Sequence, residues 1–309
     1  MSFSAEIKTE LCKLQSLPPC CRKAQCYGML LFARSFSDRA VSFVTEHPGF
    51  ARLSASMLAE EAGVFVEMQT KITHRQQMPE NCTVTVAGDD QRQQLLLHFG
   101  HEPGELHLRL KQENLQGDCC AAAFLRGAFL SCGSVIDPQR EYHLEFSVGH
   151  RHLAEDLCAL FAGLEEISLQ PAMINRKGVY VVYLKESEAI TDLLTFMGAQ
   201  NGALELIQVK MFKELRNNVN RRSNCEAANL EKTANAAATQ RVAIEKIRDQ
   251  IGLDQLPPEL RELAELRYEN PEMSLRELGE NLAEPISRSG VNHRLRRILE
   301  IAETLPERS

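Results

Sequence analysis

The chain has 309 residues, of which 44% are hydrophobic, enough for two or three domains with their own cores. No apolar run approaches the ~20 residues that cross a bilayer, and a net charge of −7 excludes a polycation that coats nucleic acid without specificity. Positive charge can still be gathered locally, because attraction to phosphate depends on where the basic groups lie.

The first residues, MSFSAEIKTELCKL, alternate charged with apolar side chains, which predicts an amphipathic helix and not a signal peptide. Without an export signal, the ten cysteines are expected in a reducing compartment. They contain no CxxC pair, and adjacent cysteines such as Cys20 and Cys21 are not expected to turn both sulfurs toward one ion. Burial as small hydrophobic side chains is the preferred interpretation, with a metal or redox role as the alternative.

An internal repeat, marked by CCRKAQCYG and CCAAAFLRG, relates residues 20–38 to residues 119–137 without a gap. Seven of the nineteen aligned positions are identical. These pairs are Cys20/Cys119, Cys21/Cys120, Ala24/Ala123, Gly28/Gly127, Leu31/Leu130, Ser35/Ser134 and Asp38/Asp137. A period near 100 residues is too long for a solenoid. The repeat therefore predicts a duplicated domain whose halves are related by a pseudo-twofold axis.

Hydrophobic periodicity predicts similar elements in each half. The expected helices cover 20–34, 52–63, 119–132, 151–163 and 187–199, with Ser187 as the N-cap of the last one. The expected strands cover 40–47, 66–73, 142–149 and 179–185. This pattern indicates an α+β fold.

Gly28 and Gly127 stand in the middle of the two repeated helices. Glycine inside a helix costs about 1 kcal/mol relative to alanine, and here the cost occurs twice at equivalent positions. Absence of a side chain lets two helices approach closely. The glycines therefore predict that these helices cross each other, although two helices that merely tolerate glycine remain the alternative.

Two such helices packed at a pseudo-dyad, each opening an αββαββ unit, resemble those of the LAGLIDADG homing endonucleases. Aligned on the glycines, the nine-residue motif of that family falls on residues 26–34 and 125–133. The resemblance implies an acid at each eighth position, where paired carboxylates hold Mg²⁺ at the scissile phosphates. Here those positions are Ala33 and Cys132, which supply no hard oxygen ligand. The resemblance thus implies a DNA-binding scaffold without its cutting chemistry.

Asp38 and Asp137 also match across the repeat and could be displaced metal ligands. A metal-dependent DNA endonuclease that uses these two acids is therefore an alternative. They lie five residues past the acid positions of the motif, beyond the expected helix ends. Asp137 precedes Pro138, a turn signature. Paired turn residues are the preferred interpretation.

An asparagine- and arginine-rich segment begins a region at 216–253 that is interpreted as a hinge and a connecting helix. Alanine then becomes frequent, which favours helix from about 225 to 250, and Gly252 fits a C-cap. The arginines of the segment are expected either to be solvated or to contact phosphates. They are Arg216, Arg221 and Arg222.

The C-terminal region, 254–309, predicts a helical domain with a helix-turn-helix motif at about 274–305. Ser274 and Glu277 form the pattern of a capping box at the start of one helix. A short turn follows, and Ser287 or Ser289 is expected to cap the next helix. Positive charge is concentrated there, since residues 286–300 contain four arginines and one acid, Glu300.

This last helix is predicted to read DNA in the major groove, because its first turns are polar and basic. The alternative is that this region forms a small helical bundle whose basic face is solvated and does not read DNA. Residues in the first turns are expected to reach base edges and the later arginines to contact phosphates. The predicted DNA-binding residues are Ser287, Arg288, Ser289, Asn292, His293, Arg294, Arg296 and Arg297.

Four stretches of the chain are similar to the WhiA-type bacterial regulators. They are MSFSAEIKTEL, GAFLSCGSVIDPQREYHLE, NVNRRSNCEAANLEKTANAA and SLRELGENLAEPISRSGVNHRLRRI. The resemblance covers almost the whole chain and departs most in the first half. It implies a cytoplasmic, nucleoid-associated transcription regulator of sporulation, cell division or chromosome segregation.

The expected architecture is α+β: a duplicated αββαββα LAGLIDADG-like domain with pseudo-twofold symmetry, followed by an all-α helix-turn-helix domain. Its expected parts are a first repeat at 1–115, a second repeat at 116–215, the hinge region and the C-terminal domain. We expect a sequence-specific regulator that binds double-stranded promoter DNA, without catalysis, metal, cofactor or membrane association. A transcription or division protein is an expected partner, and an adaptor of the division machinery is a further alternative.

Overall fold

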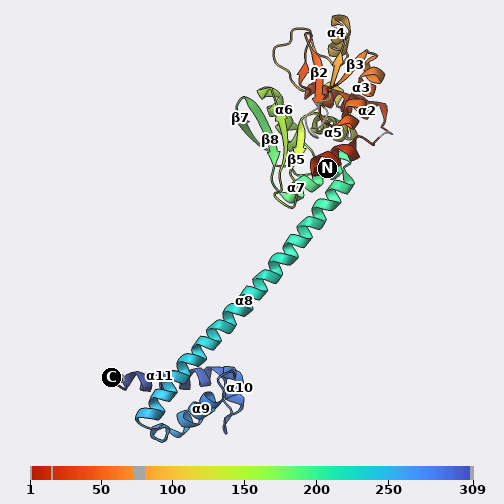
Figure 1. The fold of residues 1–309 in the computed structure, drawn as a ribbon. Helices are drawn as coiled ribbons and strands as arrows, with labels where there is room; N and C mark the ends of the chain where they lie inside the picture. The colour runs from red at the N-terminus through yellow and green to blue at the C-terminus, as the bar shows by residue number, and fades with distance from the viewer. Residues whose placement is uncertain (1, 15–16, 72–80, 307–309) are drawn as a thin grey trace. The chain divides into compact units, whose positions relative to one another are not determined.

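The protein is described by a computed structural model over residues 2–14, 17–71 and 81–306. These residues belong to two compact units, an N-terminal unit over Met1–Lys213 and a C-terminal unit over Glu214–Ser309 (Figure 1). None of the described helices is both long enough and apolar enough to span a bilayer.

The first half of the duplicated domain follows an N-terminal helix, α1 (Phe3–Leu11), as predicted from the amphipathic start of the chain. Its elements are α2 (Pro19–Leu31), β1 (Ser35–Phe36), β2 (Val41–Thr45), α3 (Pro48–Ala62), β3 (Val66–Lys71), β4 (Asn81–Val86) and α4 (Asp89–His98). The four strands form an antiparallel sheet in the order β1-β2-β4-β3.

The second half repeats this topology after a short 3-10 helix, η1 (Gln112–Asn114). Its elements are α5 (Asp118–Cys132), β5 (Gly133–Val135), β6 (Leu144–Val148), α6 (Arg151–Ala162), β7 (Ala172–Arg176), β8 (Val179–Leu184) and α7 (Ser187–Met197). The sheet order is β5-β6-β8-β7. The duplicated αββαββα order is therefore confirmed, but Ser187 is the first residue of α7, whose N-cap is Glu186.

The two halves share one hydrophobic core, in which α2 packs along α5. The helices run in the same direction. Their first turns meet where the Cys21 thiol donates to the Cys119 carbonyl, at 3.4 Å. Their last turns meet where the Ser131 hydroxyl donates to the Met29 carbonyl, at 2.7 Å.

The predicted glycine crossing is confirmed at the centre of this pair. A Cβ built on Gly28 would lie 2.2 Å from the carbonyl oxygen of Phe124, and one on Gly127 would lie 2.2 Å from that of Gln25. Both obstacles are backbone atoms, which cannot rotate away as a side chain can. Glycine is thus required at both positions because each helix rests on the backbone of the other.

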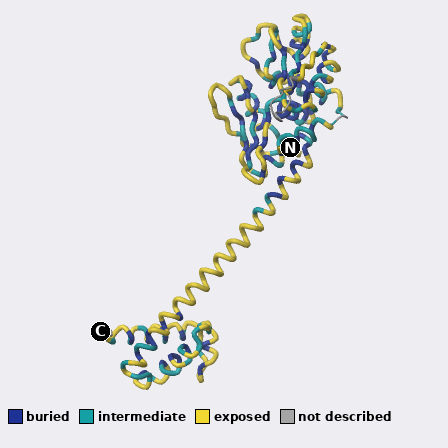
Figure 2. Tube along the Cα trace, viewed as in Figure 1, coloured by how far each residue is buried: buried dark blue, intermediate teal, exposed yellow. Residues whose placement is uncertain are grey.

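Helix α8 (Gln200–Gln250) is continuous through the asparagine-rich segment that was interpreted as a hinge. Figure 2 shows the middle of α8 as exposed. Asparagine costs less than about 0.7 kcal/mol per residue in a helix, whereas proline and glycine cost more, and neither occurs between Gly202 and Gly252. The sequence contains no residue strong enough to interrupt the helix there. Gly252, with φ 83°, follows its end as predicted.

The C-terminal unit adds η2 (Leu253–Gln255), α9 (Pro258–Glu269), α10 (Leu275–Glu280) and α11 (Arg288–Thr304) to the end of α8. Its core joins all four α-helices and contains Ala243, Ile244, Ile247, Leu256, Leu260, Leu263, Ala264, Leu278, Leu282, Val291, Leu295, Ile298 and Ala302. The end of α8 is therefore part of this domain and not a linker leading to it.

A buried arginine fixes α8 to α9 inside this unit. Arg267 is 1% exposed, and its Nε donates to Gln240 Oε1 at 2.8 Å. Its Nη1 donates to the carbonyl of Met273 at 2.6 Å. Burial lowers the pKa of Arg267, and the hydrogen bonds offset part of the cost of removing the cation from water.

Substitution of Gly127 by alanine tests the crossing of α2 and α5. The added methyl group overlaps backbone atoms of α2, so we expect Gly127→Ala to lower the free energy of unfolding by about 1–3 kcal/mol. Gly149→Ala is the control, because a Cβ there meets nothing within 4 Å. Urea denaturation followed by circular dichroism gives both values. Equal stability of the two variants would contradict the crossing.

Candidate nucleic-acid interface and the degenerate metal positions

Helices α10 and α11 form the predicted helix-turn-helix, and the backbone of the turn before α11 packs against the backbone of α10. The amide of Ile286 donates to the carbonyl of Gly279 at 3.1 Å. A Cβ on Gly279 would lie 2.4 Å from the Ile286 carbonyl oxygen and 3.0 Å from Val291 Cγ2. Gly279 therefore allows the end of α10 to lie against the turn before α11.

Both helices of the motif begin with the predicted caps. At α10, the Ser274 hydroxyl accepts from the Glu277 amide at 3.2 Å, and the Glu277 carboxylate accepts from the Ser274 amide at 2.7 Å. This capping box lowers the pKa of Glu277. At α11, Ser287 is the N-cap, and its hydroxyl accepts from the Gly290 amide at 3.3 Å. Ser289 is not the cap but lies in the first turn.

The sides of α11 differ in burial, and this difference decides which residues can meet a ligand. Val291, Leu295, Ile298 and Ala302 face the core. Seven of the eight predicted DNA-binding residues are exposed: Ser287, Arg288, Ser289, Asn292, His293, Arg296 and Arg297. Positions 289, 292, 293 and 296 follow the i, i+3, i+4, i+7 spacing of a single helical face.

Arg294 differs from the other predicted contacts. It is only half-exposed, and its Nη1 lies 3.4 Å from the carbonyl of Glu259, to which it donates. The side chain thus lies toward the start of α9 and away from the exposed face of α11.

A polar hollow of about 480 Å³ opens beside α11, within the C-terminal unit. Arg288 and Asn292 line it from α11, and Lys232 lines it from α8. Arg276, in the first turn of α10, and the buried Arg267 of α9 bring the lining cations to four. Arg276 is paired with Glu280 one turn later, at 2.8 Å. Lys232 and Arg276 were not among the predicted DNA-binding residues; the one sequence signal for Arg276 is its place at the start of the first motif helix.

The three arginines of the asparagine-rich segment lie on the exposed middle of α8. Arg216, Arg221 and Arg222 are all exposed. Arg222 forms an ion pair with Glu226 one turn later, at 2.9 Å. None of the three lines the hollow beside α11.

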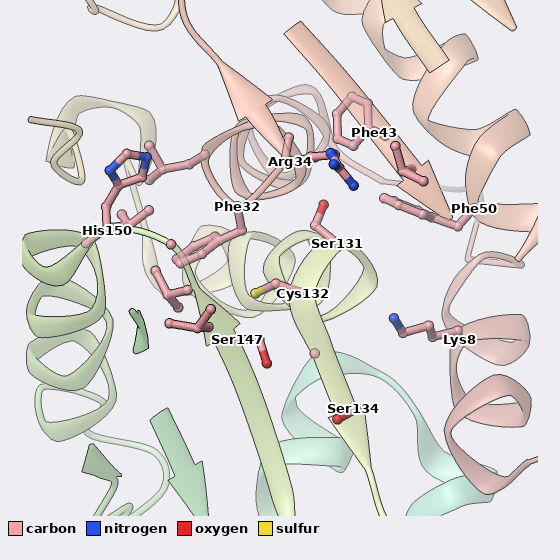
Figure 3. A pocket seen from close by; sticks show the side chains of 18 residues that line it. Lys8, Phe32, Arg34, Phe43, Phe50, Ser131, Cys132, Ser134, Ser147 and His150 are labelled. Carbon is pink, nitrogen blue, oxygen red and sulfur yellow. The ribbon is translucent and has the colours of Figure 1, made fainter. Parts of the chain in front are cut away.

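The two degenerate metal positions, Ala33 and Cys132, meet in one pocket of about 590 Å³ at the ends of α2 and α5. Figure 3 shows Cys132 between Ser131 and Ser147, with Arg34, His150 and Lys8 around it. No carboxylate is among the described residues that line the pocket. Hard divalent cations require oxygen ligands, mostly carboxylates, so these lining residues do not fit Mg²⁺.

A lysine adds positive charge to this pocket. Lys8 of α1 donates to the carbonyl of Leu130 at 3.2 Å, in the last turn of α5. Burial lowers the pKa of Lys8, while the nearby Cys132 and Cys12 raise it. Burial raises the pKa of Cys132 to about 12, although Lys8 lowers it. The thiol therefore stays protonated at neutral pH, and the pocket holds a basic group in place of two acids.

Asp38 and Asp137 lie outside the residues that line this pocket. The Asp137 carboxylate accepts from the Gln139 amide at 2.8 Å, and its carbonyl accepts from the Arg140 amide at 2.9 Å. It is thus a turn residue, as predicted. The backbone carbonyl of Asp38 accepts from Arg92 Nε at 3.0 Å.

The two units define a class of protein in which a duplicated LAGLIDADG-like domain is joined to a helix-turn-helix domain. Comparison with known families matches residues 121–216 to the "WhiA LAGLIDADG-like domain" and residues 219–302 to the "WhiA C-terminal HTH domain". The chain belongs to the WhiA family, as its sequence motifs predict.

Relatives of the chain match it over nearly its full length. It is 39% identical over 310 residues to "Probable cell division protein WhiA" of Ruminiclostridium cellulolyticum, covering 99% of this chain and 98% of that protein. It is 36% identical over 313 residues to the protein of the same name from Alkaliphilus metalliredigens, covering 98% of each. The crystal structure of full-length DUF199/WhiA from Thermatoga maritima covers 100% of both chains, with a TM-score of 0.60 and 25% identity.

Two glycines near the turn of the motif have opposite expected responses to alanine. Gly279→Ala pushes a methyl group against the Ile286 carbonyl, so we expect it to destabilise α10 and α11 by about 1–3 kcal/mol. Gly290→Ala places its methyl group 3.4 Å from the Ile286 side chain. It should be neutral or stabilise the helix by up to about 1 kcal/mol. Hydrogen exchange of the full chain measures both changes in stability. Equal protection of the amide hydrogens of α10 and α11 in the two variants would contradict the close contact at Gly279.

Proposed function

We propose that this protein is a sequence-specific DNA-binding transcription regulator that does not cleave DNA. The observation that carries the proposal is the difference between the two sides of α11. One side forms the core of a helix-turn-helix, and the other exposes arginine, asparagine, histidine and serine from its first turns. Arginine and asparagine can make paired hydrogen bonds to guanine and adenine edges in the major groove.

The proposed interface has a base-reading part and a phosphate-binding part. Ser287, Arg288, Ser289, Asn292 and His293 lie in or beside the first turns, where a recognition helix meets base edges. Arg296 and Arg297, one turn beyond Asn292 and His293, are placed to contact phosphates. Lys232 extends the same positive surface around the hollow beside Arg288. Arg276 lies there too, but its ion pair with Glu280 reduces its expected contribution. Arg294 donates to the Glu259 carbonyl in α9, so its contribution to DNA affinity is expected to be smaller.

Phosphate contact by Arg216, Arg221 and Arg222 is the second part of the proposal. Their exposure on α8 leaves the guanidinium groups accessible, and arginine contributes to affinity through counterion release. Arg222 already has a carboxylate partner in Glu226, so its net contribution is expected to be smaller than that of the other two.

The biological role proposed is control of cell division, with chromosome segregation and sporulation as related processes. The relatives named above carry "cell division" in their names, and the chain aligns with them from end to end. A regulator of promoters acts on the chromosome, so a cytoplasmic, nucleoid-associated location is part of the same proposal.

The proposal excludes DNA cleavage because of the chemistry of the pocket at Ala33 and Cys132. Phosphodiester hydrolysis of the LAGLIDADG type depends on carboxylates that hold metal ions near the scissile phosphate. The described lining of this pocket has basic and hydroxyl side chains but no carboxylate. The N-terminal unit is then a second binding surface, either for DNA or for a transcription or division protein.

A protein partner is favoured by exposed apolar side chains at the start of α8. Leu204, Ile207 and Met211 are 56%, 40% and 58% exposed and recur at helical spacing, and the adjacent Phe212 is 72% exposed. Contiguous exposed apolar side chains are typical of protein-binding surfaces. Such a partner is compatible with DNA binding by the C-terminal unit.

Two arginines of α11 are expected to contribute differently to binding. Arg288→Ala should weaken binding to the preferred DNA sequence by about 1–3 kcal/mol and reduce discrimination. Arg296→Ala should weaken all sequences alike and lower the slope of log affinity against log salt by about 1. Titrations with a site selected from a random library and with unrelated DNA separate the two effects.

Arg261→Ala is the matched control for these titrations. It removes the same charge from the same unit, but Arg261 lies on α9, paired with Asp254 at 3.1 Å. We expect its DNA affinity to remain close to that of the unchanged protein. Wild-type affinity and specificity in Arg288→Ala would refute the recognition assignment.

Absence of nuclease activity is a separate prediction. Supercoiled plasmid and a library-selected linear site, incubated with the protein and Mg²⁺ or Mn²⁺, should remain uncut. Cleavage that is abolished by Asp137→Asn or Asp38→Asn, while DNA affinity is retained, would establish the alternative of a metal-dependent endonuclease.

A further inference from the structure

Four cysteines converge where the first turns of α2 and α5 meet. The sulfur atoms of Cys20, Cys21, Cys119 and Cys120 all lie within 4.8 Å of one another. Cys20 and Cys21 are the second and third residues of α2, and Cys119 and Cys120 hold the same positions in α5. The cluster is therefore a direct product of the internal repeat and the parallel packing of the two helices.

The expectation that adjacent cysteines cannot direct both sulfurs to one point was wrong. The sulfurs of Cys20 and Cys21 are 4.0 Å apart. At the start of a helix, no preceding turn restricts the side chains, so neighbouring residues have more freedom than in the middle. The missing CxxC spacing is replaced by two CC pairs, separated by 99 positions, that the fold brings together.

The cluster lies where anionic sulfur is stabilised. The amino end of a helix carries partial positive charge and lowers the pKa of thiols placed there. Two such ends meet here, and neither helix start has a side-chain cap in the part of the chain that the structure describes. The backbone amides of Gln116 and Gly117 form hydrogen bonds that favour the Cys120 thiolate, although burial raises its pKa overall.

A buried guanidinium adds a full positive charge nearby. Arg126 is 7% exposed and donates to Gln25 Oε1 at 3.0 Å and to the Met197 carbonyl at 2.6 Å. Burial lowers the pKa of Arg126, and its attraction to Cys21 opposes that effect. Without a cation between the sulfurs, burial and the neighbouring thiols raise the pKa of Cys21 to about 12.

We propose that Cys20, Cys21, Cys119 and Cys120 form a tetrathiolate site for a Zn²⁺ ion. Tetrahedral coordination with Zn–S bonds of about 2.3 Å requires sulfurs about 3.8 Å apart. The cluster needs only a small contraction to reach this geometry. Zinc is commonly bound by four cysteines in structural sites, whereas Mg²⁺ and Ca²⁺ need oxygen ligands.

The ion ties together the two halves of the duplicated domain. It connects residues that are about 100 positions apart in the chain. A crosslink that closes a long loop restricts the unfolded chain more than one that closes a short loop. With four protein ligands it has no open position for substrate, so its role is structural. The site lies at the opposite end of the helix pair from Ala33 and Cys132, and it is thus distinct from the degenerate nuclease position.

Metal titration of the full-length, reduced and chelator-treated protein tests this site. Co²⁺ should produce the absorption bands of tetrahedral thiolate coordination, and one equivalent of Zn²⁺ should remove them. Zn²⁺ should also raise the melting temperature of the N-terminal unit, because an ion that binds the folded state stabilises it by mass action. After reloading with Zn²⁺ and removal of the excess, elemental analysis should give one zinc per chain.

Cys20→Ser and Cys119→Ser should each weaken Zn²⁺ binding by more than the roughly 10–100-fold that loss of a group outside the ligand set costs. Cys225→Ser is the matched control, because Cys225 is an exposed cysteine on α8, far along the chain from the cluster. Circular dichroism of each metal-free variant shows whether it is folded.

The site would be overturned if the folded wild-type protein gave no thiolate–Co²⁺ absorption. It would also be overturned if Cys20→Ser kept the Zn²⁺ affinity of the wild-type protein, or if Cys225→Ser lost as much Zn²⁺ affinity as Cys20→Ser. A disulfide among the four cysteines in protein purified with its cellular metal content, detected as a loss of two hydrogens by intact mass, would also contradict it.

Discussion

The contact of α2 with α5 through Gly28 and Gly127 is the constraint on which the N-terminal unit depends. Each helix rests on the backbone of the other, with 2.2 Å between a built Cβ and a carbonyl oxygen. This approach joins the two halves into one core. It also fixes which residues meet at the two ends of the helix pair, because the helices run in the same direction.

The two ends of this pair have opposite electrostatic character. Amino ends of helices favour anions and carboxyl ends favour cations. The cysteine pairs lie at the amino ends, and Lys8 donates to a carbonyl of the last turn of α5 at the carboxyl end. In the LAGLIDADG pattern, carboxylates at the carboxyl ends need a divalent cation to offset them. With Ala33 and Cys132 at those positions, there is no carboxylate pair to neutralise, and Lys8 supplies a basic group beside the end of α5.

Much of this arrangement could be predicted from sequence, because the signals were local or repeated. The glycine crossing, the capping box at Ser274 and the cap at Ser287 each follow from residue type and position. Three features were not predicted. β1 and β5 have only two and three residues and give no alternation. The helix through the asparagine-rich segment was missed although its signal, 49 residues without proline or glycine between Gly202 and Gly252, is in the sequence. The meeting of four sulfurs is a tertiary contact between residues 99 positions apart.

The central claim is that DNA meets the exposed face of α11 and not a nuclease centre at the ends of α2 and α5. Site-specific photo-crosslinking tests it most directly. A photoreactive amino acid is placed at Asn292 in one protein and at Ala33 in another, and each is irradiated with library-selected DNA. The account predicts efficient crosslinks from position 292, whether or not DNA also reaches position 33 of the N-terminal unit. Crosslinks from position 33, with none from position 292, would contradict it.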